Sequence, residues 1–296
     1  NENLIPWSFI FSGVYVGLSA GLFLPYSDSI AILFVNLIFY NYICLPKDKD
    51  NYLRWGLIFT LSFLGMLIKP TVLIVLFAII IVEICKSYKY HQLNSKSFIY
   101  VLILLISFYG VRRYKYLQAD LLLGGAENLY GSPMATPFTH YLMMGMNKNS
   151  LGMYNQEDAT YTASFTTRNL KIQGDLKIIK QRLDDFGFSG YLDFLSQKLA
   201  SNYSSGTFCF DQSARNYQNV FFSSNNTVST FFRYFYYSDD NIYLNLSQVV
   251  WQLLLFLTVL STFLCQNREK YVLHLSIIGI SIFTLIFEGS PKYSVI

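Results

Sequence analysis

Charged side chains at the ends of apolar stretches are the first candidates for chemistry in this 296-residue chain. Lys69, within IKPT, is the only charged residue between Arg54 and Glu83. Asp28 is the only carboxylate in the short segment YSDS, and Glu288 ends another apolar run. A lysine beside a bilayer can bind an anionic lipid headgroup, and a carboxylate can ligate a divalent cation or position a hydroxyl group. The structural alternatives are a snorkelling lysine, an N-cap at Asp28 and a salt bridge at Glu288.

Further basic side chains lie near the same apolar ends. Arg112 and Arg113 follow one apolar run, and Lys292 comes four residues after Glu288. Together with Lys69 they could bind one anion at the membrane surface. The alternative for the two arginines is the charged flank of a membrane helix.

The segment 136–158 holds two more candidates. His140 could hydrogen-bond a sugar or a phosphate near neutral pH, and Thr139 stands beside it. The structural alternative for His140 is a packed, hydrogen-bonded histidine. Gly145 and Gly152 allow turns, which suggests that this segment acts as a lid over a site.

The composition indicates which kind of protein must position these side chains. The chain is 53% hydrophobic and only 14% charged, whereas soluble domains are about 25% charged. This balance is typical of a polytopic membrane protein. The net charge of +4 includes no long basic run, so we expect no nucleic acid partner. No motif identifies a cofactor, and a divalent cation at Asp28 stays an open alternative.

Seven apolar segments are candidates for membrane crossings, some of them short. They predict an all-α polytopic membrane protein. Pro70 would end a helix, which predicts two short helices that meet near one membrane face. The segments are 7–25, 30–44, 55–68, 71–85, 98–111, 246–265 and 272–287.

Basic residues of the short loops predict the orientation, because positive charge marks the cytoplasmic side. Asp28, Lys69 and the region 112–245 then face outward. We expect a multi-pass protein of the cell membrane with transmembrane helices in 1–111, an extracytoplasmic loop domain in 112–245 and two further transmembrane helices in 246–296. The inward residues are Lys47, Lys49, Arg54, Lys86, Lys89, Lys96, Arg268 and Lys270.

The predicted loop domain has mixed, mainly helical character. An amphipathic helix is expected to end near Gly187, followed by a second helix over 191–200. The aromatic run at 231–237 is typical of the membrane interface, and the adjacent Glu157 and Asp158 are typical of a solvated loop. The apolar positions of the first helix are Ile172, Leu176, Ile179, Leu183 and Phe186.

Four features together resemble the C-type (GT-C) polytopic glycosyltransferase superfamily. They are an outward YSD, a helix break at IKPT, a large external loop late in the chain, and EGSPKY at the outer end of the last apolar run. The resemblance includes protein O-mannosyltransferases, aminoarabinose transferases and integral membrane glycosyltransferases of Gram-positive bacteria. The stretch TPFTHYLMMGMNKNSLGMYNQEDATYT is similar to one in the Gram-positive members.

The resemblance implies a GT-C-like helical bundle that transfers a sugar from a polyprenyl-phosphate donor, with inversion, to a cell-envelope glycan or protein acceptor. Members usually carry the catalytic Asp just after the first helix, so we expect a fragment that lacks the amino-terminal helix and that base. Members more often have Arg where Lys292 stands, and Lys lacks the bidentate fork. The implied donor phosphate ligands are Lys69, Arg112, Arg113 and Lys292, with Glu288, Tyr293 and Thr139 in support and Asp28 and His140 as candidate catalytic residues.

Other functions stay open at this point. An O-antigen-type polymerase or ligase also has a large external loop and uses lipid-linked donors, and four arginines of the loop fit that reading: Arg168, Arg182, Arg215 and Arg233. A transporter would show paired half-helices, for which only IKPT qualifies. A non-catalytic scaffold is the third alternative.

Overall fold

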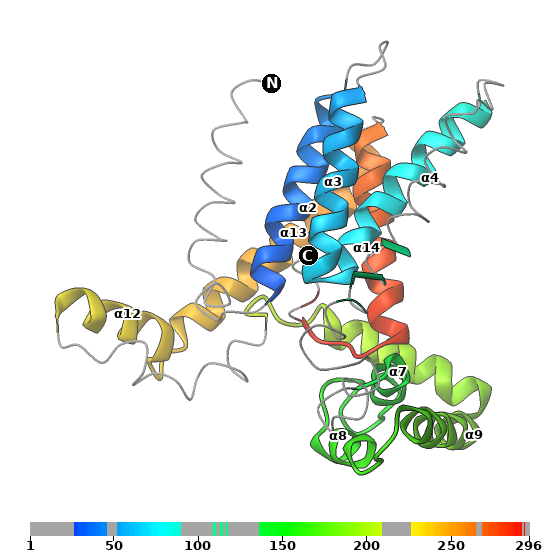
Figure 1. Ribbon diagram of the computed structural model, residues 1–296. Coiled ribbons are helices and arrows are strands. Elements are labelled where there is room, and N and C mark those ends of the chain that lie inside the picture. Colours follow the sequence, from blue (N-terminus) through cyan, green and yellow to red (C-terminus); the bar gives the residue numbers. More distant parts are fainter. Residues whose placement is uncertain are drawn as a thin grey trace.

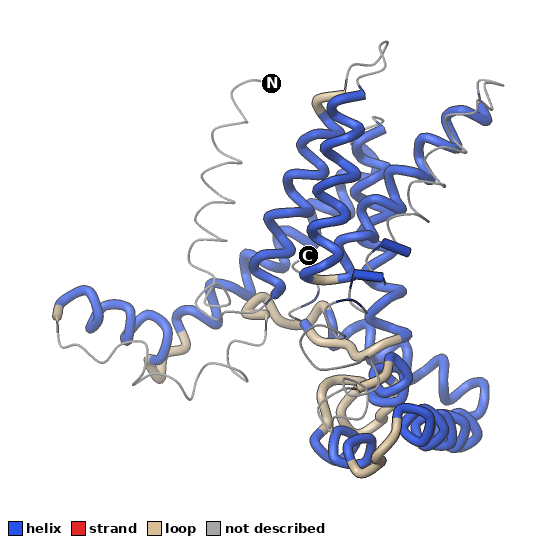
Figure 2. The backbone as a smooth tube through the Cα atoms, viewed as in Figure 1, coloured by secondary structure: helices blue, strands red, loops and turns tan. Residues whose placement is uncertain are grey.

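The protein is helical throughout the part that the computed structural model describes, namely residues 27–45, 52–89, 109–110, 113–114, 117, 136–208, 226–264, 268–291 and 293. These residues form nine α-helices and one short 3-10 helix, and none of them forms a strand (Figure 1, Figure 2). The all-α class expected from the sequence is thereby confirmed.

Five apolar helices form the membrane bundle: α2 (Ser27–Ile43), α3 (Tyr52–Ile68), α4 (Leu73–Lys89), α13 (Ile242–Leu264) and α14 (Arg268–Ile286). Pro70–Tyr88, Ile242–Phe263 and Arg268–Ile286 are long and apolar enough to cross a membrane. Helices α2 and α3 have 17 residues each. At 1.5 Å per residue they are about 26 Å long, so they reach across most of a hydrocarbon core of about 30 Å.

These helices correspond to five of the seven predicted apolar segments. Four of them start three or four residues earlier than the apolar runs, because backbone hydrogen bonds continue into the polar ends of each run. The segment 7–25 and nearly all of 98–111 lie outside the described residues.

The helix break predicted at Pro70 is present. Helix α3 ends at Ile68, Lys69 is extended with φ −147° and ψ 121°, and the 3-10 helix η2 (Pro70–Val72) leads into α4. Proline has no backbone N–H to donate and its ring disfavours the helical conformation of the preceding residue. Lys69 is therefore held at the turn between two membrane helices. This turn between α3 and α4 lies at one end of the bundle (Figure 1).

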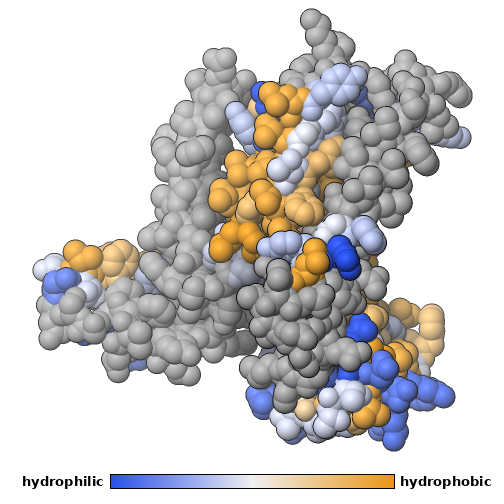
Figure 3. All heavy atoms as spheres, viewed as in Figure 1, coloured by the Kyte–Doolittle hydropathy of each residue, from blue (hydrophilic) through white to orange (hydrophobic). Residues whose placement is uncertain are grey.

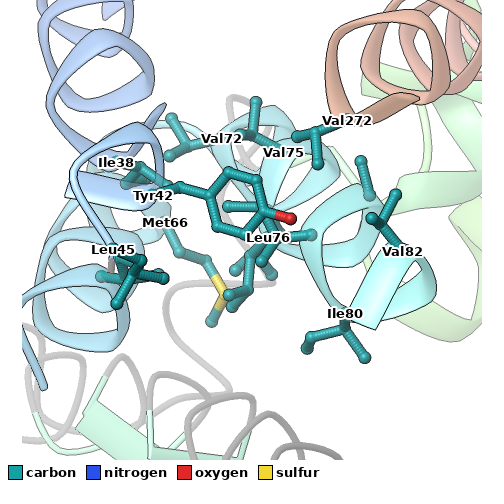
Figure 4. Close-up of a cluster of buried hydrophobic side chains, with 14 of the residues drawn as sticks. Ile38, Tyr42, Leu45, Met66, Val72, Val75, Leu76, Ile80, Val82 and Val272 are labelled. Atoms are coloured by element: carbon teal, nitrogen blue, oxygen red, sulfur yellow. The ribbon is translucent and has the colours of Figure 1, made fainter. Parts of the chain in front are cut away.

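The bundle core is a cluster of buried aliphatic and aromatic side chains from α2, α3, η2 and α4 (Figure 4). Ile38, Ile58 and Ile79 are completely buried in it, and Val272 joins it from α14. Lipid tails are as apolar as these side chains, so close van der Waals packing, more than the hydrophobic effect, holds such helices together.

A polar network closes the opposite end of the bundle. The Tyr42 hydroxyl donates to Oε1 of Glu83 over 2.8 Å, and the Arg268 guanidinium lies 4.0 Å from the same carboxylate. Arg268 also donates to the carbonyl oxygen of Leu45 over 2.8 Å. Charged groups near membrane helices are costly unless they are paired, so this network fixes α2, α4 and α14 relative to one another.

The loop domain consists of α7 (Phe138–Gly145), α8 (Gln156–Ala163) and α9 (Arg168–Asn202), and it lies at the Lys69 end of the bundle (Figure 1). In Figure 3 hydrophobic residues gather over α2 and α3, whereas hydrophilic residues predominate over the loop domain. Helix α9 bends at Gly187, whose φ of 59° and ψ of 178° are not helical. This bend confirms the predicted helix end near Gly187 and the second helix after it.

The end of the loop domain is attached to α13. Trp251 donates from its indole nitrogen to the Tyr203 carbonyl oxygen over 2.8 Å, and the two rings stack in parallel. Tyr203 also hydrogen-bonds Ser281 of α14 over 2.6 Å. Helix α12 (Thr227–Tyr237), which contains the predicted aromatic belt, precedes α13 and presents exposed aromatic side chains.

Candidate functional site

An ion pair stands at the turn between α3 and α4. The ammonium of Lys69 pairs with Oδ1 of Asp28, which belongs to the first turn of α2. Only 13% and 15% of the two side chains are exposed. A largely buried pair of this kind is costly to break by removing one partner, because the remaining charge is then unpaired.

The segment after α14 completes a cluster around this pair. Lys69 Nζ lies 4.4 Å from the centre of the Tyr293 ring, and the Tyr293 hydroxyl hydrogen-bonds the carboxylate of Glu288. Burial, reinforced by the negative charges of Glu288 and Asp28, raises the pKa of Tyr293. Tyr293 therefore stays a neutral hydrogen-bond donor. We call Asp28, Lys69, Glu288 and Tyr293 the Lys69 cluster.

The chemistry available to the Lys69 cluster follows from its groups. A lysine ammonium can bind an oxyanion, a carboxylate can accept a proton, and a neutral phenol can donate a hydrogen bond. All four residues were selected from the sequence, and the structure brings them together from α2, the α3–α4 turn and the segment after α14.

An apolar cavity of about 340 Å³ lies between the membrane helices and reaches the same turn. Its walls include Phe39 from α2, Ile74 from α4, Leu254 from α13 and Ile277 from α14. Thr71, two residues after Lys69, also lines it, and the buried Thr71 hydroxyl has no hydrogen-bond partner among the described residues. A hydroxyl in that state is destabilising by about 1–3 kcal/mol unless a ligand or water satisfies it.

Lys198 of α9 connects the loop domain to the end of α14, and sequence reasoning did not select it. Its side chain is completely buried. Its ammonium donates to the carbonyl oxygens of Gly145 (2.6 Å), Leu285 (3.0 Å) and Phe287 (2.6 Å). These carbonyls belong to helix ends, where a cation is favoured by the helix dipole. Burial lowers the pKa of Lys198 to about 7, against the opposing effect of the nearby Glu288 charge.

One sequence signal could have found Lys198. It stands four residues after Phe194 and four before Asn202, and all three are buried. A lysine on the buried stripe of a helix needs a partner, whereas a lysine on the polar face does not.

Comparison of the sequence with known protein families identifies the family to which the chain belongs. Residues 3–293 match the family described as "Conserved hypothetical integral membrane protein". The chain belongs to this family. Neither the curated proteins nor the solved structures include a match to it. The family description supports an integral membrane protein, in agreement with the helices described above, and it assigns no glycosyltransferase activity.

His140 and Thr139 have protein partners in the structure. Asp175 accepts hydrogen bonds from the hydroxyls of Thr139 and Thr162, each over 2.7 Å. The Thr162 hydroxyl uses its proton on Asp175, so it accepts from Nδ1 of His140, 2.9 Å away. Burial lowers the pKa of His140, against the charges of Asp175 and Asp158. The two residues stabilise the loop domain, which agrees with the packed histidine named as the alternative.

Asp158 departs from the solvated loop expected for it. It lies in the first turn of α8, only 6% exposed, and Arg182 binds both of its oxygens at 2.6 and 3.1 Å. Asn147 donates to the same carboxylate over 2.9 Å. A bidentate pair that crosses from α8 to α9 cannot be seen in the local sequence around Asp158.

The two glycines of 136–158 serve close packing. A Cβ atom at Gly145 would lie 2.5 Å from the carbonyl oxygen of Phe287. Gly152 has φ +75°, and its carbonyl oxygen accepts from the N–H of Gly289 over 2.8 Å. This segment is therefore docked on the end of α14.

Of the other predicted phosphate ligands, the structure describes only Arg113. Arg113 is exposed. Arg112 and Lys292 lie outside the described residues. No group of three or more His, Cys, Asp or Glu side chains that could hold a metal ion occurs in the described part of the chain.

Proposed function

We propose that this protein is a membrane glycosyltransferase that moves a sugar from a polyprenyl-phosphate donor to an acceptor outside the membrane. One observation carries the proposal: the Lys69 cluster adjoins an apolar cavity inside the membrane bundle. A site with a cation at the membrane surface and an apolar space beside it fits an amphiphile with an anionic head and an apolar tail.

The position of Thr71 supports one continuous site. Thr71 lines the apolar cavity, and only Pro70 separates it from Lys69. An oxygen near the junction of head and tail could accept a hydrogen bond from the Thr71 hydroxyl. The donor would thus satisfy the polar atom that the protein leaves without a partner among its described residues.

In the proposed reaction the donor phosphate replaces Asp28 as the ion-pair partner of Lys69. The carboxylate of Asp28 is then available as the general base. The acceptor hydroxyl oxygen attacks the anomeric carbon of the sugar, and the bond from that carbon to the phosphate oxygen breaks. Polyprenyl phosphate leaves with the electron pair, stabilised by Lys69, and the hydroxyl proton passes to Asp28.

Glu288 and Tyr293 have a supporting role in this scheme. Glu288 orients the Tyr293 ring beside the Lys69 ammonium, and Lys198 binds the carbonyl oxygens just before Glu288. The loop domain would in this way set the position of a membrane-surface site. Pre-set positions of this kind lower the cost of organising charges during reaction.

The test measures transfer of a labelled sugar from a panel of polyprenyl-phosphate sugars by the full protein in membranes. Lys69→Ala is expected to lower the rate by about 100-fold or more, since one contact to leaving-group charge has that effect. The double variant Asp28→Asn/Lys69→Met removes both charges together, which commonly preserves folding.

The double variant separates catalysis from stability. We expect it to keep the wild-type thermal stability within a few degrees and to remain inactive. Transfer at the wild-type rate by the double variant would show that the pair serves the fold alone. A protein that transfers no sugar from any member of the panel would overturn the proposal itself.

A further inference from the structure

A second cavity lies on the loop domain, at the bend of α9, and none of its lining residues belongs to the Lys69 cluster. Its volume is about 370 Å³, within the range of about 300–1,000 Å³ that small-molecule sites occupy. Residues of α9 on both sides of Gly187 line it, and the loop after α7 closes it. Gly187 makes the bend possible, because its φ of 59° with ψ of 178° is a region that only glycine adopts readily.

The lining combines amides, carboxylates and aromatic rings. Asn149 and Gln197 contribute side-chain amides with donors and an acceptor, whereas the Asn147 amide is already hydrogen-bonded within the protein. Phe186 and Phe194 contribute two rings whose centres are 4.8 Å apart. Alternating donors and acceptors beside an apolar ring surface suit a ligand that has many hydroxyl groups and C–H faces.

The charges around the cavity disfavour an anionic ligand. Arg182 is committed to Asp158, and Asp193 accepts a hydrogen bond from Gln197 over 2.8 Å. Lys148 is the other basic residue of the lining, and Glu157 and Asp185 add two further carboxylates. A phosphate would meet the three carboxylates, whereas the hydroxyl groups of a neutral ligand can donate hydrogen bonds to them.

The rim of the cavity is organised by hydrogen bonds within the protein. Asn147 donates to Asp158 and accepts from the backbone N–H of Asn149 over 3.0 Å. Arg182 also donates to the carbonyl oxygen of Met143 over 2.5 Å. A rim fixed in this way loses little freedom when a ligand binds, which favours affinity.

We propose that the cavity at the bend of α9 binds a neutral carbohydrate, one to three sugar units long. Part of the cavity lining lies on the same half of α9 as Lys198, which docks the loop domain on the end of α14. The inference concerns binding and does not need the transferase to be correct. Where transfer also holds, the bound glycan has the chemistry of an acceptor.

The experiment measures binding of neutral trisaccharides of glucose, mannose, galactose and N-acetylglucosamine to the full protein in nanodiscs by calorimetry. Gly190 lines the cavity, and a Cβ there would meet only the Phe186 Cβ, at 4.0 Å, within the described chain. A side chain at this position therefore begins without a clash at Cβ, and Gly190→Leu adds apolar volume to the cavity lining. Gly56→Leu is the matched control, since the described chain has no atom within 4 Å of a Cβ at that position of α3.

We expect at least one trisaccharide to bind, and Gly190→Leu to weaken binding about tenfold or more while Gly56→Leu leaves it unchanged. Asn149→Ala should weaken binding about fivefold, because one hydrogen bond is lost. Three results would overturn the inference: no trisaccharide binds, Gly190→Leu binds as the wild type does, or oligolysine or inorganic phosphate binds instead. Lys69→Ala, which tests transfer, should leave trisaccharide binding intact, so the two proposals fail separately.

Discussion

Replacement of Lys198 by Met tests how the loop domain is held on the membrane bundle. Met keeps the length and the apolar stem of the lysine but has no N–H to donate. The carbonyl oxygens of Gly145, Leu285 and Phe287 would then lose their common donor. Two of these bonds, to Leu285 and Phe287, cross from the loop domain to the end of α14. At about 1 kcal/mol net for each hydrogen bond, docking of the loop domain should weaken by about 2 kcal/mol.

Hydrogen exchange at the backbone amide of Gly289 is a direct measure of this docking. That N–H donates to the Gly152 carbonyl oxygen over 2.8 Å, across the boundary between the loop domain and the end of α14. A loss of about 2 kcal/mol in the opening free energy corresponds to exchange about 30-fold faster. The membrane helices themselves should keep their protection.

Lys180→Met on the same helix is the matched control, because Lys180 is exposed. It removes an equal charge and should leave the exchange rate of Gly289 unchanged. Equal rates in the Lys198 and Lys180 variants would refute the conclusion that Lys198 holds the two parts together. Uniformly faster exchange through α14 in the Lys198 variant would instead indicate global unfolding and refute the local effect.

Three further predictions concern the same parts of the molecule. Docking of the loop domain should strengthen as pH rises from about 7 toward 10.5, because burial lowers the pKa of Lys198 to about 7 in the docked state and the open state therefore binds more protons in this range. Below this range docking should be weakest and independent of pH. Exchange at the Gly289 amide, corrected for its intrinsic pH dependence, measures this change. Gly145→Ala should lower the melting temperature, since its Cβ would lie 2.5 Å from the Phe287 carbonyl oxygen, whereas Gly190→Ala should not. Thr71→Val should leave the ligand-free protein as stable or about 1 kcal/mol more stable, measured by thermal unfolding, and should weaken donor binding if that ligand satisfies the hydroxyl.

Much of the fold could be predicted because the rules involved act on short stretches of chain. Apolar length marks the membrane helices, proline at 70 ends one of them, and glycine at 187 interrupts another. The positions of Asp28, Lys69 and Glu288 at the ends of apolar runs already indicated a shared membrane face. The pairing of Asp28 with Lys69, and the link from Lys69 to Glu288 through Tyr293, needed the folded chain.

The partners of polar side chains were much harder to predict. Asp158 looks like a loop residue in sequence but accepts a bidentate bond from Arg182, 24 residues away. His140 looks available to a ligand but is engaged by Thr162, 22 residues away. The hydrogen-bond partner of each side chain depends on which helices pack together, since a buried polar group bonds to a donor or acceptor that packing places next to it.

The sequence by itself determined that this protein is a helical membrane protein, where several of its membrane helices lie, and which charges stand near their ends. The bilayer and the backbone impose those features locally, because each apolar run must bury its own peptide groups. Tertiary structure alone decided that Lys198 binds carbonyl oxygens 87 and 89 residues away and thereby joins the loop domain to the Lys69 cluster. No local rule sets such a pairing, since it exists only when the ends of α7, α9 and α14 are packed against one another.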